Sequence, residues 1–152
     1  MCAEYLKKIL LRRILSLLAS IMLIMMLLCS GSAHAQFNIN RLISSGRVAL
    51  HYEDYVLSIQ YFSQVILLKP YMYEPWQLRA VSKFYLDDYG GAESDATEAI
   101  KLNPYIPELY DLRGISRIRQ KKYADAIADY AKAIKLSPDN QNYWYNRAVC
   151  RI

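Results

Sequence analysis

Apolar residues recur along residues 37–152 at spacings of three and four, which place them on one face of an α-helix. No stretch alternates between apolar and polar residues with the period of a β-strand. Short polar turns, such as residues 87–91 and 120–122, separate the helical segments. The pattern predicts an all-α fold with helices at about 37–51, 55–68, 74–86, 90–102, 108–120, 124–136 and 141–152.

The same pattern returns every 34 residues. Pro70, Pro104 and Pro138 each close a similar string of apolar and polar residues. A proline at this place follows a helix that it cannot continue, so each unit contains two helices and ends at its proline. Unrelated helical hairpins have no reason to share one period. The repetition therefore predicts stacked units, none of which buries its apolar face alone.

The repeat aligns several columns of side chains besides the prolines. Large residues occupy the first column, which contains Leu42, Trp76, Tyr110 and Trp144. Small residues occupy a column four positions later, which contains Gly46, Ala80, Gly114 and Ala148. In the second helices, one column contains Tyr55, Tyr89 and Tyr123, and another contains Phe62, Ala96 and Tyr130. The small column lies one helical turn from the large one, where a small side chain lets another helix approach closely.

These columns resemble the tetratricopeptide repeat (TPR) family, whose pattern combines a large aromatic, a small residue, an aromatic, alanines and a closing proline in 34 residues. The resemblance implies a right-handed superhelical solenoid. Its units would be residues 39–72, which are degenerate, then 73–106 and 107–140, and the start of a fourth at 141–152. The chain departs from the family at the leucine expected before the small column, where it has Ser45, Arg79, Arg113 and Arg147.

The first 35 residues have the order of a secretory signal peptide. A basic start is followed by an apolar run at residues 14–28 and a small-residue segment that ends in Ala33-His34-Ala35. We expect cleavage between Ala35 and Gln36 and export to the periplasm or cell envelope. An uncleaved membrane anchor is the alternative, although the run is short of the roughly 20 residues that span a bilayer. Lipidation at Cys29 is disfavoured because Leu28 precedes it, at a position where the bacterial lipoprotein signal has a small residue.

Removing the leader changes the apparent charge. The whole chain has 19 Lys and Arg against 14 Asp and Glu, a net charge of +5. Residues 36–152 retain 15 and 13 of these, a net charge of +2. A basic face able to neutralise several phosphates is therefore not expected, and nucleic acid is excluded as a partner.

The sequence offers little for catalysis or metal binding. His51 is the only histidine after the leader, and no Ser, Cys or Asp pattern around it indicates a nucleophile and its base. Cys150 is the only cysteine after the leader, so we expect a small buried residue and no internal disulfide. We predict no enzyme activity, no catalytic residues, no metal site and no cofactor.

The resemblance places peptide binding on the concave face that the first helices of the units form. The residues that we assign to binding on this face are Arg47, His51, Gln77, Tyr85, Asp111, Arg119 and Tyr145. Four neighbouring apolar residues are expected to pack between units instead, namely Val81, Phe84, Ile115 and Ile118. The clamp with which some family members hold acidic chaperone tails is missing, because its lysine, two asparagines, lysine and arginine are replaced by Ile43, Arg47, Leu78, Glu108 and Leu112.

We therefore expect an exported TPR-like scaffold that binds a protein or peptide in the bacterial cell envelope. The alternative is that these units are the structural front part of a longer enzyme or transport component whose activity lies beyond Ile152. The last helix presents Trp144, Ala148 and Val149, which ought to receive another helix. Self-association through this uncapped unit is the alternative to a continuation of the chain.

Overall fold

The structure is a computed structural model that describes the backbone of residues 2–150 and the side chains of residue 13, residues 17–26 and residues 38–150. Its seven helices are α1 (Cys2–His51), α2 (Tyr55–Leu68), α3 (Tyr73–Tyr85), α4 (Tyr89–Leu102), α5 (Pro107–Arg119), α6 (Tyr123–Leu136) and α7 (Gln141–Val149). No strand occurs among residues 2–150, so the predicted all-α fold class is confirmed.

The helix boundaries agree with the sequence pattern except at the start of α1 and at the end of α7, which was expected to continue to residue 152 but ends at Val149. Helices α2 to α6 begin and end within one residue of the predicted bounds. Helix α1 ends at His51 as expected, but it begins at Cys2 and not near residue 37, which corrects the prediction. The reason is composition, because residues 2–36 are rich in leucine, methionine and alanine and contain no proline to end a helix. The side chains of the expected cleavage site, Ala35 and Gln36, lie outside the described residues.

The chain divides into two compact units, residues 1–40 and residues 41–152. The first unit consists of the greater part of α1. Within the described residues, no helix combines the length and the apolar character needed to cross a bilayer.

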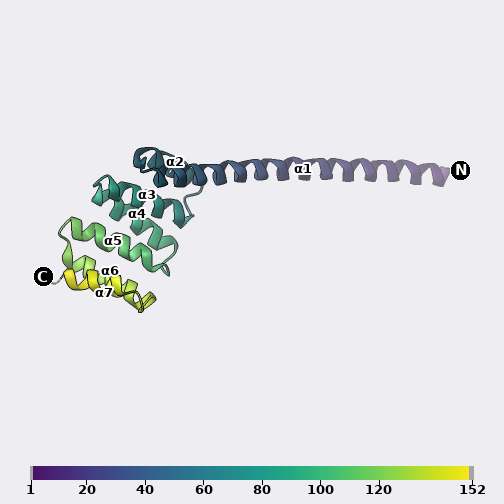
Figure 1. Ribbon diagram of the computed structural model, residues 1–152. Coiled ribbons are helices and arrows are strands. Elements are labelled where there is room, and N and C mark those ends of the chain that lie inside the picture. The colour runs from purple at the N-terminus through teal and green to yellow at the C-terminus, as the bar shows by residue number, and fades with distance from the viewer. Residues whose placement is uncertain (1, 151–152) are drawn as a thin grey trace. The chain divides into compact units, whose positions relative to one another are not determined.

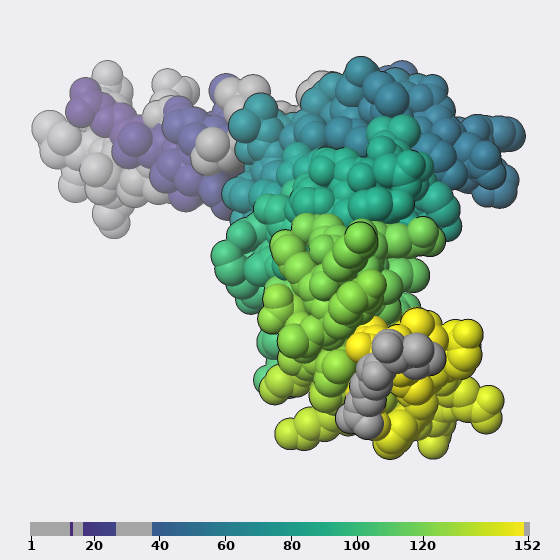
Figure 2. Space-filling view, turned by 90° about the vertical axis from the view of Figure 1, so that its left-hand side faces the viewer, coloured from purple at the N-terminus to yellow at the C-terminus, as the bar shows by residue number. Residues whose placement is uncertain are grey.

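In the second unit, helices that follow one another in sequence pack together from α2 through α7 (Figure 1). The space-filling view shows the layers of this unit in chain order, with α7 in yellow at the end of the series (Figure 2). Helix α3 also contacts α5, so the first helices of adjacent repeats lie next to each other. This arrangement gives them a common face.

The two helices of a repeat fit together by matching side-chain volumes. A Cβ atom added at Gly46 would lie 2.8 Å from Cε1 of Phe62, and one added at Gly114 would lie 3.0 Å from Cζ of Tyr130. In the repeat between them, the same two columns contain Ala80 and Ala96, and both are fully buried. A glycine thus faces an aromatic ring in two repeats, and alanine fills both columns in the third. Close packing makes such compensation necessary.

A hydrogen bond joins each closing proline to the large aromatic residue that follows it. Each proline carbonyl accepts a hydrogen bond from the side chain six residues later, from Trp76 Nε1 to Pro70 at 3.0 Å, from the Tyr110 hydroxyl to Pro104 at 3.1 Å, and from Trp144 Nε1 to Pro138 at 2.9 Å. The proline cannot donate a backbone hydrogen bond, but its carbonyl is free after the helix end. This contact explains why the prolines and the aromatic column repeat together.

The turn inside each repeat has the same backbone geometry. The residues in the left-handed region are Glu53, Asp87 and Lys121, with φ angles of 60°, 60° and 61°. In the first two turns the next residue caps the second helix, since Asp54 accepts from the Leu57 amide and Asp88 from the Gly91 amide. In the third turn the lysine at this place makes no side-chain cap. A tight turn of this kind sets the angle between the paired helices.

Candidate functional site

A groove of about 260 Å³ lies between α3 and α5. We call it the inner groove, and its lining residues are Gln77, Val81, Phe84 and Tyr85 from α3 and Glu108, Asp111, Leu112 and Ile115 from α5. It lies on the face that the first helices of adjacent repeats share, because α3 and α5 are in contact. A hollow of about 460 Å³ also occurs beside α2, lined by residues between Ser44 and Tyr61. None of the residues assigned to binding from sequence lines that hollow.

The inner groove brings together three of the seven side chains assigned to binding, namely Gln77, Tyr85 and Asp111. Tyr85 is 59% exposed and stacks on the ring of Tyr55, with ring centres 5.0 Å apart and planes 10° from parallel. The stacking holds Tyr85 as a rigid aromatic surface in the lining of the groove. Such a residue can contact a ligand at a low cost in side-chain entropy.

The other four assigned residues do not line the groove. Arg47 forms an ion pair with Glu74 of α3. His51 lies edge-on to the ring of Tyr52, 5.3 Å away, and Tyr145 of α7 is 70% exposed.

Arg119 contacts an aromatic residue that lines the groove. Its guanidinium is 5.9 Å from the ring centre of Phe84, which lines the groove, and 5.9 Å from that of Tyr89. It therefore flanks the groove over an aromatic ring, in a cation–π contact.

The apolar wall of the groove consists of residues expected to pack between units. Val81, Phe84 and Ile115 are half-buried between α3 and α5, and they also line the groove. Ile118 packs against the buried cluster around Tyr130, as expected. A ligand in the groove would therefore cover apolar surface that the repeats leave open.

Sequence reasoning missed two lining residues, Glu108 and Leu112. Both were considered only as departures from the chaperone clamp. Glu108 precedes Asp111 by three residues, and Leu112 precedes Ile115 by three, so each pair shares a face of α5. Helical spacing from the assigned residue Asp111 would have found Glu108, whereas Leu112 follows only from Ile115, which was not assigned to binding.

The charge in the groove is acidic. Glu108 and Asp111 are its two ionisable carboxylates, and no lysine or arginine is among the lining residues. Burial raises the pKa of Asp111, and the hydrogen bond that it accepts from Nδ2 of Asn146 at 3.4 Å only partly opposes this. The nearby charge of Glu108 raises it further. A cation placed beside Asp111 would relieve both effects.

Tyr130 lies beneath the same region with its ring fully buried. Among the described residues, its hydroxyl has no hydrogen-bond partner of normal geometry. Burial raises the pKa of Tyr130 far above its usual value, and the neighbouring Asp111 carboxylate adds to the effect. The hydroxyl is therefore neutral and keeps its proton.

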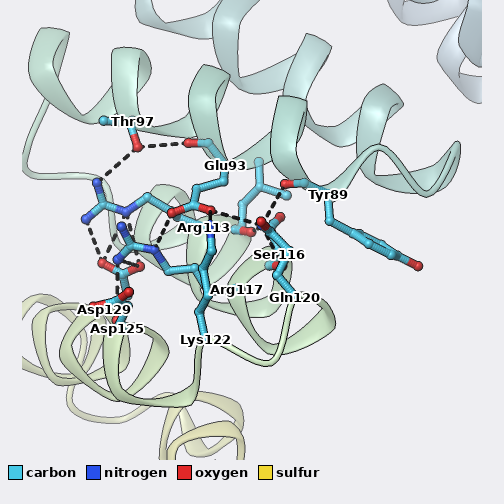
Figure 3. A network of polar contacts seen from close by, with 11 residues as sticks. Tyr89, Glu93, Thr97, Arg113, Ser116, Arg117, Gln120, Lys122, Asp125 and Asp129 are labelled. Atoms are coloured by element: carbon cyan, nitrogen blue, oxygen red, sulfur yellow. Dashed lines mark hydrogen bonds and ion pairs between the residues drawn. The ribbon is translucent and has the colours of Figure 1, made fainter.

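A polar network holds α5, one wall of the groove, between α4 and α6 (Figure 3). The Glu93 carboxylate accepts hydrogen bonds from Arg117 at 2.8 Å, Gln120 at 2.9 Å and Lys122 at 2.8 Å. Partial burial works to raise the pKa of Glu93, but these three donors lower it to about 2. Glu93 of α4 is thus joined to α5 and to the turn between α5 and α6.

In the second and third repeats an arginine replaces the leucine expected before the small column, and each of these two arginines holds a buried aspartate. Arg79 binds Asp95 with two hydrogen bonds of 2.7 and 2.8 Å, and the closest contact of Arg113 with Asp129 is 2.6 Å. Both aspartates are only 2% exposed. A second cation completes each pair, Lys83 at 2.9 Å from Asp95 and Arg117 at 2.7 Å from Asp129. The departure from the family pattern is therefore a buried ion pair between the two helices of a repeat.

Comparison with known proteins supports the repeat architecture. Residues 107–140 match the family model described as tetratricopeptide repeat. No protein of curated function matches the sequence.

Solved structures with the same fold include several TPR domains. The first TPR domain of Spaghetti (RPAP3), bound to the HSP90 peptide SRMEEVD, is 24% identical with a TM-score of 0.73, over 75% of this chain and 90% of that one. The Arabidopsis OM64 TPR domain is 22% identical with a TM-score of 0.72, over 74% and 93%. The second TPR domain of human RPAP3, in complex with the HSP70 peptide SGPTIEEVD, is 20% identical with a TM-score of 0.71, over 75% and 98%.

Proposed function

We propose that this chain is a scaffold that binds a segment of a partner protein in the inner groove. The premises are that residues 107–140 match a tetratricopeptide repeat and that the helical array has the fold of a TPR solenoid. The observation that carries the proposal is the open groove between α3 and α5, with apolar side chains, a rigid tyrosine and two carboxylates along its lining. Peptide recognition needs apolar pockets for contact area and a few polar groups for orientation.

The preferred ligand is a segment that places a lysine or arginine beside an apolar residue. Its cation would lie against Glu108 and Asp111, and its apolar side chain against Val81, Phe84 and Ile115. Raised proton affinity at Asp111 favours a ligand cation, because the cation stabilises the ionised carboxylate. Arg119, over Phe84, would exclude a second ligand cation from that end of the groove.

The proposed preference for a basic ligand is opposite in charge to the peptides bound by two of the structural neighbours. Those TPR domains are bound to SRMEEVD and SGPTIEEVD, which both end in two glutamates, a valine and an aspartate. In the groove of this chain, Glu108 and Asp111 would repel such an acidic tail. The proposed function therefore keeps the binding mode of a scaffold and changes the charge of its ligand.

Selection from a random peptide library by the full chain tests the ligand preference. The parent is expected to enrich peptides with Lys or Arg next to an apolar residue, and Glu108→Gln combined with Asp111→Asn is expected to remove that enrichment. Glu98→Gln is the matched control, because Glu98 pairs with Lys101 on α4 and does not line the groove. Enrichment of acidic peptides, or the same enrichment by all three proteins, would contradict the proposal.

We further propose that the scaffold acts in the bacterial cell envelope after cleavage between Ala35 and Gln36. The support is the order of basic start, apolar run and small-residue segment in residues 1–35. Intact-mass measurement of the endogenous product, combined with fractionation, tests this. A product that begins at Gln36 in the soluble envelope fraction is expected, whereas a product that retains residues 1–35 in the membrane fraction would indicate an anchor.

A further inference from the structure

Opposite charges lie at opposite ends of one row of side chains on α5. Asp111, Ile115 and Arg119 follow one another at intervals of four residues, so they share a face of this helix. Glu108 precedes Asp111 by three residues and adds a second carboxylate at the acidic end. The row runs from acidic through apolar to basic, over about 12 Å from Asp111 to Arg119 at a rise of about 1.5 Å per residue.

The other wall of the groove carries no charge that would change this order. The repeat places Gln77, Val81 and Tyr85 of α3 in the columns of the three residues of the row, and all three line the inner groove. They provide an amide, an apolar side chain and an aromatic ring. The order of charge along the groove is therefore set by α5.

Arg119 differs from the other two arginines of α5. Arg113 and Arg117 each bind a buried carboxylate of α6. Arg119 is exposed, and its guanidinium lies 5.9 Å from the ring centres of both Phe84 and Tyr89. A guanidinium that lies against aromatic rings keeps its N–H groups at the edge of its plane, where a carboxylate can accept two of them.

The carboxylate beside these rings does not pair with Arg119. Asp87 accepts a hydrogen bond from the hydroxyl of Tyr89. Within the part of the chain that the structure describes, no carboxylate forms an ion pair with Arg119. The edge of the guanidinium is thus open to the carboxylate of a ligand.

The dimensions of the groove favour an extended ligand. Its volume of about 260 Å³, spread over about 12 Å of α5, gives a cross-section of about 22 Å². A helix is about 10–12 Å across and does not enter so narrow a hollow. In an extended segment every second side chain points to the same side, at intervals of about 6.5 Å. Successive residues of the row are about 6 Å apart, so the two spacings match.

We propose that the inner groove binds a charge-ordered segment, in which a Lys or Arg and an Asp or Glu are four residues apart with an apolar residue midway between them. The cation contacts Asp111, and the carboxylate binds the edge of Arg119. The apolar side chain contacts Val81 and Ile115. This inference rests on the proposed function, because it specifies the ligand of the same groove. A segment parallel to α5 has the cation first, and an antiparallel one has the anion first.

Fluorescence anisotropy with the full chain and synthetic peptides is the test. The two parent peptides contain Lys-Ser-Leu-Ser-Glu and the reverse order, Glu-Ser-Leu-Ser-Lys, between neutral flanks. At least one order is expected to bind saturably. Replacing its Glu by Gln should weaken binding about threefold to fivefold, the range of an exposed ion pair. Raising the ionic strength should reduce the difference between the Glu and Gln peptides.

Variants of the chain identify the partner of the peptide carboxylate. Arg119→Gln should weaken binding of the Glu peptide as much as loss of the Glu does, and it should leave binding of the Gln peptide unchanged. Arg147→Gln is the matched control, because Arg147 also lies over an aromatic ring, that of Trp144, and does not line the groove. It should alter the binding of neither peptide.

The distance between the charges gives a separate check. A peptide with Lys and Glu only two residues apart spans about 6.5 Å, about half the length of the row. It should bind no better than the Gln peptide, and Arg119→Gln should not change its binding. An equal effect of Arg119→Gln at both spacings would contradict the match of lengths and overturn the proposal.

The outcomes separate this inference from the function on which it rests. If the Glu and Gln peptides bind equally well, or if Arg119→Gln affects both alike, the charge order is wrong while the preference for a basic ligand stands. If no peptide that contains Lys beside the apolar residue binds, the inference and the proposed function both fail.

Discussion

Arg113 of α5 binds Asp129 of α6 across the interior of the third repeat, with Nη2 and Oδ1 2.6 Å apart. Arg79 and Asp95 form the same contact in the second repeat. Asp129 is 2% exposed. A buried carboxylate is tolerated only when it is paired and hydrogen-bonded, and Arg117 supplies the second partner at 2.7 Å. The two helices of a repeat are therefore joined by charge in addition to apolar packing.

Loss of the Asp129 carboxylate should lower the stability of the fold. Asp129→Asn is expected to lower the free energy of unfolding by about 3 kcal/mol, because two half-buried guanidinium groups lose their counter-ion. Urea unfolding followed by circular dichroism measures it. Glu98→Gln, which breaks an exposed pair with Lys101, is the control and should cost under about 0.5 kcal/mol. A loss at Asp129 no larger than the control would show that the pair does not join the helices.

Tyr130→Phe should leave stability unchanged or raise it by up to about 1 kcal/mol. The hydroxyl of Tyr130 has no hydrogen-bond partner of normal geometry among the described residues, so its removal relieves a desolvation cost without breaking a bond. The ring, which faces Gly114, is retained. Thermal unfolding of the two proteins is the measurement. A drop in stability above about 1 kcal/mol would mean that the hydroxyl makes a strong interaction.

Gly114→Ala should destabilise the third repeat by about 1–3 kcal/mol. The added Cβ would lie 3.0 Å from Cζ of Tyr130, and the ring is fully buried and has little room to move. Ala80→Gly, in the repeat where alanine is found in both columns, is the comparison and should cost about 1 kcal/mol through backbone freedom and lost packing. No loss of stability from Gly114→Ala would argue against volume matching as the reason for the small column.

The Glu93 network predicts a loss of stability in acid. The pKa of Glu93 in the folded protein is about 2, below its ordinary value of 4.5. Its contribution is therefore complete above about pH 4.5, and it declines as the pH falls from there toward 2. The difference in unfolding free energy between the parent and Glu93→Gln should shrink over this window. A difference that is constant from pH 6 to 3 would contradict the assigned pairing with Arg117 and Lys122.

The turn residue Lys121 has a φ of 61°, a conformation that suits glycine. Lys121→Gly is expected to raise stability by about 1 kcal/mol, because a side chain in the left-handed region costs about that much. Lys121→Ala is the control and should bring no gain, since the strain remains. If both variants gain equally, the effect comes from removal of the charge.

The fold could be predicted from sequence because its determinants are local and periodic. The closing prolines, the small column and the turn residues recur every 34 residues, and they fix the helix bounds from α2 to α6. The start of α1 could not be predicted from the repeat pattern, since the residues that precede the first repeat form a helix by their own propensity. The aspartate partner of each arginine was missed because it lies 16 residues away on another helix, and no helical spacing points to it.

The groove was only partly predictable for a related reason. Gln77, Tyr85 and Asp111 were found by their columns, which continue from one repeat to the next. Arg47 lies in an equivalent column, but its ion pair with Glu74 uses the guanidinium that was expected to face a ligand. A column gives the position of a residue, whereas its neighbours on the adjacent helix decide whether the side chain remains available.

Photo-cross-linking in cells that produce the chain tests most directly the central claim that the inner groove holds a partner protein. A photoreactive residue replaces Gln77 in the groove and, as the control, Ser94, which is exposed on α4 and does not line it. The account predicts a discrete adduct with another protein from Gln77, absent from Ser94 and lost when Glu108→Gln and Asp111→Asn are added. Identical adducts from both positions, or an adduct from Gln77 that survives loss of the two carboxylates, would contradict it.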